Sequence, residues 1–189
     1  MPKGKSRSAK KQARRPKHTN ARVARPPKNA TSASALPKKT TLAGFLLRMA
    51  AFFGVPYLLL HIVPLDPLLD AIAAIESALL KAAGVASTQF GAVLSSNAAW
   101  FQIVPDCSGL VMVFLLAGLL WSTPVKRPKR VFIVFAPLLL AWNLVRLFLV
   151  LYAGGVLGQT VQDVLHVGLW FVDAGIVLGI WWMAFSKAR

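Results

Sequence analysis

The sequence predicts an all-α membrane protein: a polytopic bundle of four transmembrane helices, with a fifth as an alternative, plus one interfacial helix. Three observations support this prediction. Of the 189 residues, 56% are hydrophobic, and the mean hydropathy is +0.59. Only 15% are charged, against about a quarter in a soluble domain. The 22 lysines and arginines outnumber the 6 acidic residues, and most of them lie near the N-terminus.

The N-terminal segment 1–41 has a composition of its own. It holds 13 of the 22 lysines and arginines and also His18. It has no acidic residue and no phenylalanine, tyrosine or tryptophan. Such a segment buries too little apolar surface to offset the entropy of ordering, so we predict a disordered cytoplasmic arm that binds anionic membrane lipid. A mitochondrial presequence has a similar composition and is the lesser alternative. No specific nucleic-acid partner is expected.

The membrane domain is predicted to span residues 42–189. Its candidate spans are 42–63, 108–122, 131–153 and 163–185, of which 108–122 is short. Pro56 predicts a kink in the first span, because proline has no N–H for the helix.

The stretch between the first two spans is less apolar. Residues 66–83 have helical periodicity, and this predicts an interfacial helix, with a fifth span as the alternative. Its predicted apolar face consists of Leu68, Leu69, Ile72, Ile75, Leu79 and Leu80. Residues 84–104 alternate weakly, which fits either a short hairpin or an irregular segment.

Basic residues predict the orientation of the spans. The arm, the loop 123–130 and the C-terminal end are basic, whereas 64–106 and 154–162 contain only Lys81 against four acidic residues. The positive-inside rule then places both termini in the cytoplasm with four multi-pass spans, in the inner (plasma) membrane.

In this topology three reactive residue types fall in the outer leaflet. Cys107 starts the second span, Arg146 lies about 10 Å from the outer end of the third, and His166 lies one turn inside the fourth. A thiolate can attack a peptide carbonyl, an imidazole can move the proton, and a guanidinium can stabilise the oxyanion. The three therefore suit nucleophilic acyl transfer.

Neighbouring residues suggest support for this chemistry. Ser108 and Gly109 are expected in the first turn of the second span, whose N-terminus would lower the thiol pKa of Cys107. Asn143 precedes Arg146 by three residues and shares its helix face, so it is expected to hold the guanidinium or bind a substrate carbonyl.

Other assignments of these residues stay open. A lone cysteine is often a small buried apolar residue, and His61 is expected to be an interfacial residue. Asp173 is a candidate to pair with Arg146, to orient His166 or to be protonated; Asp163 is the other candidate to orient His166. One cysteine excludes an intramolecular disulfide and a multi-cysteine metal site, and no metal or cofactor is expected.

These residues also carry a resemblance. Pro105-Asp106-Cys107-Ser108-Gly109-Leu110, then Asn143-Leu144-Val145-Arg146, then His166 resemble the exosortase/archaeosortase family of integral membrane cysteine transpeptidases, with His166 favouring a bacterial exosortase. The resemblance implies that Cys107 is the nucleophile, Arg146 the oxyanion- or substrate-binding residue and His166 the acid/base. The role of Asp106 stays open, because family members commonly have an acidic residue two positions before the cysteine.

The resemblance also implies the substrates. These would be exported proteins with a C-terminal sorting tail, made of a short motif, a span and a basic cluster, cleaved on the outer side of the membrane. The rival interpretation is a non-catalytic assembly or anchoring protein that uses its basic arm to bind anionic lipid or an acidic partner. That rival predicts that Cys107 is dispensable.

Overall fold

The computed structural model describes residues 41–96 and 99–187. The predicted arm, except for Thr41, and His18 within it lie outside the described residues. The described chain is mostly helical, in agreement with the predicted helical membrane class. In this part of the chain, three helices are long and apolar enough to cross a membrane: Leu42–Ile62, Pro128–Leu157 and Gln159–Ser186. A fourth apolar helix, Leu110–Ser122, is shorter, so the number of spans stays a prediction.

The first membrane-length helix contains a π-helical turn. It consists of α1 (Leu42–Met49), the π-helix η1 (Ala50–Gly54) and α2 (Val55–Ile62). The N–H of Val55 donates to the carbonyl of Ala50, five residues back. Pro56 follows directly and has no N–H to continue an α-helical ladder, which is a common setting for such a bulge. The predicted irregularity at Pro56 therefore lies mainly in the turn before it.

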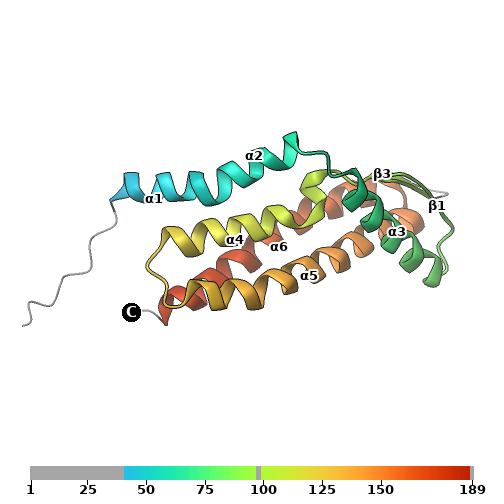
Figure 1. Cartoon of the computed structure of the whole chain (residues 1–189). Helices are drawn as coiled ribbons and strands as arrows, with labels where there is room; N and C mark the ends of the chain where they lie inside the picture. Colours follow the sequence, from blue (N-terminus) through green and yellow to red (C-terminus); the bar gives the residue numbers. More distant parts are fainter. Residues whose placement is uncertain (1–40, 97–98, 188–189) are drawn as a thin grey trace, which may run out of the picture. The chain divides into compact units, whose positions relative to one another are not determined.

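The helices α4 (Leu110–Ser122), α5 (Pro128–Leu157) and α6 (Gln159–Ser186) pack together (Figure 1). Gly158 alone connects α5 to α6, with φ of 96°. So short a connection makes the two helices antiparallel neighbours. An apolar cluster joins the three helices, with buried members Met112, Val113, Leu116, Leu119, Leu120, Leu139, Val177 and Ile180.

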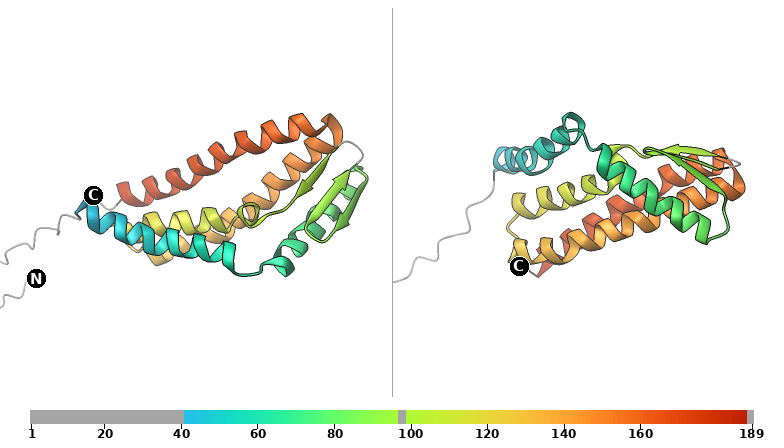
Figure 2. Two further views of the ribbon diagram at one scale, coloured as in Figure 1. Left: turned by 90° about the horizontal axis from the view of Figure 1, so that it is seen from above. Right: turned by 45° about the vertical axis from the view of Figure 1, so that its right-hand side comes forward.

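Several helix ends lie together at one end of this unit. The start of α1, the basic loop between α4 and α5, and the end of α6 lie at one end, opposite α3 and the strands (Figures 1 and 2). This is the arrangement that the positive-inside rule requires if the basic loop faces the cytoplasm.

The predicted all-α class needs one correction. Strands β1 (Ser87–Phe90), β2 (Val93–Ser96) and β3 (Trp100–Gln102) form an antiparallel sheet in the order β1-β2-β3. A turn at Gly91, with φ of 58°, connects β1 to β2. Of the two possibilities for residues 84–104, the hairpin is therefore the one observed, extended by a third strand.

The helix α3 (Asp66–Ala82) covers the predicted segment but buries a different face. Leu69, Ile72 and Leu80 are buried as expected, together with Ala73, Glu76 and Ser77. Leu68, Ile75 and Leu79 are exposed. Because α3 packs against β1 and α5 and carries apolar residues on two sides, its hydrophobic periodicity does not decide which side is buried.

Candidate active site

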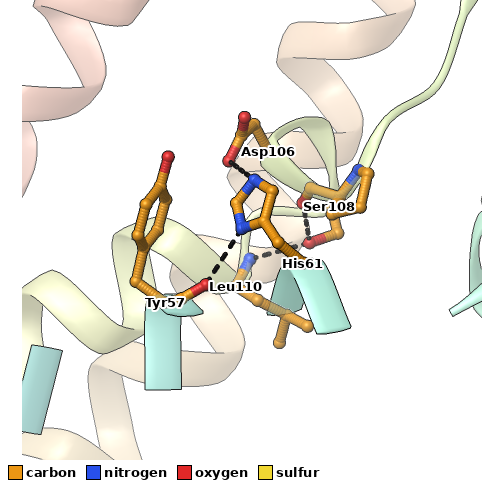
Figure 3. Close-up of polar contacts among 6 residues, drawn as sticks. Tyr57, His61, Asp106, Ser108 and Leu110 are labelled. Carbon is orange, nitrogen blue, oxygen red and sulfur yellow. Dashed lines mark hydrogen bonds and ion pairs between the residues drawn. The ribbon is translucent and has the colours of Figure 1, made fainter. Parts of the chain in front are cut away.

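Cys107 lies in a short 3₁₀ helix, η2 (Pro105–Ser108), just before α4. Its side chain is buried, with 2% exposure, and its N–H donates to the carbonyl of Val104 at 2.8 Å. The Ser108 hydroxyl donates to the Pro105 carbonyl at 2.6 Å and accepts from the N–H of Leu110 at 3.3 Å (Figure 3). Ser108 and Gly109 therefore precede the second span, not forming its first turn as predicted.

The backbone next to Cys107 is fixed from α5. The Asn143 Nδ2 donates to the Cys107 carbonyl at 2.7 Å. Gly109 has φ of 80°, and a Cβ at this position would lie 2.8 Å from the Asn143 Cβ. Only glycine fits this conformation and this contact without a shift. Asn143 thus holds the backbone of Cys107, not the guanidinium of Arg146.

The environment of Cys107 favours the neutral thiol. Burial raises the pKa of the thiol above its ordinary value, and the carboxylate of Asp106 adds to the increase. The hydrogen bond from Val104 and the charge of Arg146 act in the opposite direction but are smaller. Burial therefore outweighs the effects that lower the pKa of this thiol, and the net direction is opposite to the expected lowering.

Arg146 of α5 is buried in an ion pair with Asp173 of α6. Its Nη1 donates to Asp173 Oδ2, and the indole Nε1 of Trp142 donates to Asp173 Oδ1 at 2.9 Å. The Nε and Nη2 of Arg146 are buried and donate to no group in the described residues. Asp173 thus orients the guanidinium, and two of the donor groups of Arg146 are available to another acceptor.

An apolar hollow of about 550 Å³ opens between α4 and α6 beside this pair. Asp106, Arg146 and Asp173 supply its polar wall, and Met112, Trp170 and Val177 are among the apolar residues that complete it. Cys107 itself is not in the lining, although its neighbour Asp106 is. The guanidinium therefore faces space next to the nucleophile's turn.

His166 lies half-buried on α6, between Phe101 and Trp170. Its ring centroid is 5.3 Å from that of Phe101, in an edge-on contact, and 6.3 Å from that of Trp170. The Nδ1 of His166 is buried, without a hydrogen-bond partner in the described chain. The charge of Arg146 acts on both Cys107 and His166.

Asp163 does not orient His166 through a hydrogen bond. Its carboxylate accepts from the Nε2 of Gln159 at 2.9 Å, on the exposed side of α6. The other candidate to orient His166 is Asp173. Its carboxylate accepts hydrogen bonds from Arg146 and Trp142 instead.

A comparison with protein families finds a match. The family described as Transmembrane exosortase (Exosortase_EpsH) matches residues 34–185, most of the chain. The chain belongs to the transmembrane exosortase family. Neither the curated proteins nor the solved structures that were compared contain a match to it.

Two residues of this exosortase emerge from the structure alone. The Nε2 of His61 lies 3.7 Å from Asp106 Oδ1, and its Nδ1 donates to the carbonyl of Tyr57 at 3.0 Å (Figure 3). His61 was expected to be an interfacial residue, and its contact with Asp106 places it beside the turn that contains Cys107. Trp142 was also missed, although it precedes Arg146 by four residues and so shares its helix face.

The described residues of the exosortase offer no evident metal site. Within residues 41–96 and 99–187, no group of three or more His, Cys, Asp or Glu side chains is close enough to hold a metal ion. The chemistry available here is that of the thiol, the imidazoles, the carboxylates and the guanidinium.

Proposed function

We propose that this exosortase is a membrane-embedded cysteine transpeptidase or protease that cleaves the C-terminal sorting signal of exported proteins. The site would act on the outer side of the inner membrane, with both termini in the cytoplasm. Support comes from the family membership and from the basic loop between α4 and α5, which follows the opposite end of α4 from η2. A substrate's own transmembrane tail would hold its cleavage site at the depth of Cys107.

In the proposed reaction, the Sγ of Cys107 attacks the scissile carbonyl carbon while the thiol proton passes to His166. The carbonyl oxygen becomes an oxyanion that accepts from the free donors of Arg146. The C–N bond then breaks, and the leaving amine takes the proton from His166. The resulting thioester is resolved by an acceptor amine, which gives transpeptidation, or by water, which gives hydrolysis.

The observation that carries this proposal is the state of Arg146. Asp173 and Trp142 fix its orientation from one side, while its buried Nε and Nη2 lack partners among the described residues. A buried donor without a partner is costly, so the arrangement suits an acceptor that arrives with the substrate. The same charge partly offsets the effect of burial on the thiol of Cys107.

The test uses a tailed reporter, an exported protein that ends in a short motif, an apolar span and a basic cluster. Cells that express the wild-type chain should shorten this reporter. Cys107→Ala and Arg146→Lys should abolish or strongly reduce shortening, since lysine lacks the planar fork of donors. His166→Ala should lose more activity than His61→Ala, which removes a contact to Asp106 and a hydrogen bond to the Tyr57 carbonyl.

Membrane abundance of each variant is measured in the same cells. Ser95→Ala, on the exposed side of β2 and outside the site, is the control for expression and handling. Full shortening of the reporter by Cys107→Ala at normal abundance would remove the enzymatic proposal. The rival, a non-catalytic assembly or anchoring protein, would then be preferred.

A further inference from the structure

Strand β3 has an outer edge that faces α6. The register pairs Leu94 with Phe101, and hydrogen bonds run from Ser96 N–H to the Ala99 carbonyl and from Ile103 N–H to the Ala92 carbonyl. In an antiparallel ladder, hydrogen-bonded pairs alternate with non-bonded pairs. The backbone groups of Trp100 and Gln102 therefore point away from β2, towards the outer edge.

At Trp100 this edge is already occupied. The N–H of Trp100 donates to Gln159 Oε1 at 3.1 Å, and its carbonyl accepts from Gln162 Nε2 at 3.1 Å. A donor and an acceptor from two side-chain amides thus take the place that a neighbouring strand would fill. These side chains also show that the edge accepts amide partners from the side of α6.

At Gln102 the edge is vacant. Gln102 is exposed. In the described chain, neither its outward N–H nor its outward carbonyl has a hydrogen-bond partner. Gln159, Gln162 and His166 follow one another along α6, and the first two contact Trp100 while His166 contacts Phe101. Strand and helix therefore run in the same direction, and the vacant position lies on the His166 side of the glutamines.

The chain runs directly from this edge to the nucleophile. Residues Gln102 and Cys107 are separated by five positions, and Val104 is still extended, with φ of −106° and ψ of 165°. Helices α5 and α6 contribute four buried polar atoms without partners in the described chain: Nδ1 of His166, Oδ1 of Asn143, and Nε and Nη2 of Arg146. A peptide supplies both the donors and the acceptors that such atoms lack.

We infer that the outer edge of β3 at Gln102 is the docking strand for the substrate, which pairs there as an extended segment and so brings its scissile peptide to Cys107. This inference rests on the proposed function. Main-chain hydrogen bonds to an exposed sheet edge are a general means of binding extended peptides. The paired segment ends before Trp100, because Gln159 and Gln162 already bond the backbone groups of Trp100 on the same edge.

Proline substitution tests the edge directly. Gln102→Pro removes the outward N–H but no ladder bond to β2. We expect shortening of the tailed reporter to fall about ten-fold or more, as one lost hydrogen bond to the substrate and a disturbed pairing would give. Gln102→Ala keeps the N–H and should retain clearly more activity than Gln102→Pro.

Gln89→Pro is the control at the opposite edge, and its effect is read against Gln89→Ala, because both variants lose the side-chain hydrogen bonds from Gln89 to the carbonyls of Asp70 and Gly91. By the same alternation, the N–H of Gln89 points outward from the opposite edge of the sheet, on β1. This variant should shorten the reporter at a rate near that of the wild type, after correction for abundance. Equal loss in the two proline variants, or equal loss in Gln102→Pro and Gln102→Ala, overturns the inference.

Photo-crosslinking gives a second measurement. In the Cys107→Ala chain, p-benzoylphenylalanine replaces either Gln102 or Gln89, and the tailed reporter is present. The reporter should crosslink at position 102 and not at 89. A crosslink between two copies of the chain, or no protein crosslink because lipid covers the edge, contradicts the inference. If wild-type cells do not shorten the reporter at all, the proposed function fails; if they do and Gln102→Pro is equally active, only the docking edge is wrong.

Discussion

Gly109→Ala tests the contact that fixes the backbone of the nucleophile. Alanine at φ of 80° costs roughly 1–2 kcal/mol in the left-handed region. Its Cβ would also lie 2.8 Å from the Cβ and 2.9 Å from the Cγ of Asn143. Because both atoms belong to a buried side chain, relief of this overlap adds about 1–3 kcal/mol. The total destabilisation is therefore about 2–5 kcal/mol.

Gly84→Ala separates the two contributions. Gly84 has φ of 82°, nearly that of Gly109, but an added Cβ there meets no atom within 4 Å. This variant should show the backbone cost alone, roughly 1–2 kcal/mol. The difference between the two variants then measures the overlap with Asn143.

The assay is thermal unfolding of the purified full chain in detergent, together with shortening of the tailed reporter. Gly109→Ala should have a Tm about 5 °C below that of Gly84→Ala, from the usual 2–4 °C per kcal/mol for a chain of this size. Its activity should fall further than its abundance, because Asn143 can no longer bond the Cys107 carbonyl in the same position. Equal Tm values and equal activities for the two variants would refute the packing described around Gly109.

Three further predictions follow from buried groups. Burial raises the pKa of Glu76 to about 7 from 4.5, so the free energy of unfolding falls as the pH rises between these two values, by about 3 kcal/mol in all. Glu76→Gln should therefore raise the Tm more at pH 8 than at pH 5, and an equal effect at both would contradict this. Asp173→Asn should destabilise the chain by roughly 3–5 kcal/mol, because it leaves a buried guanidinium charge without its partner. The double variant Arg146→Met with Asp173→Leu should recover stability but not activity. If the double variant does not recover stability, the buried ion pair is contradicted. Cys107 should react with a membrane-impermeant maleimide on the order of ten-fold more slowly in the folded protein than in denaturant, and rapid labelling of the folded chain would be inconsistent with its burial.

The sequence was sufficient for the features that depend on composition and periodicity. Apolar length located the helices within a few residues. Helical spacing also named Asp173 as a partner candidate for Arg146. These inferences use one-dimensional regularities, which do not require knowledge of which helices are neighbours.

The remaining features depend on neighbours in space. Nothing local distinguishes the two apolar sides of α3, and only its packing on β1 and α5 selects the side that contains Glu76. The pKa of Cys107 depends on burial, which outweighs the favourable charge of Arg146. The contact of His61 with Asp106 joins two residues 45 positions apart, and no periodic pattern links them.

The π-helical turn Ala50–Gly54 determines which way His61 points. A π turn is equivalent to one extra residue in an α-helix, and each residue turns the helix by about 100°. Deleting Ala51 would let the segment close into a regular α-helix and would rotate α2 by that angle relative to α1. His61 would then face away from Asp106, although every residue of α2 would be unchanged. The alignment of these two side chains is thus set by a one-residue insertion two to three helical turns away, so it depends on the length of this helix and not only on its composition.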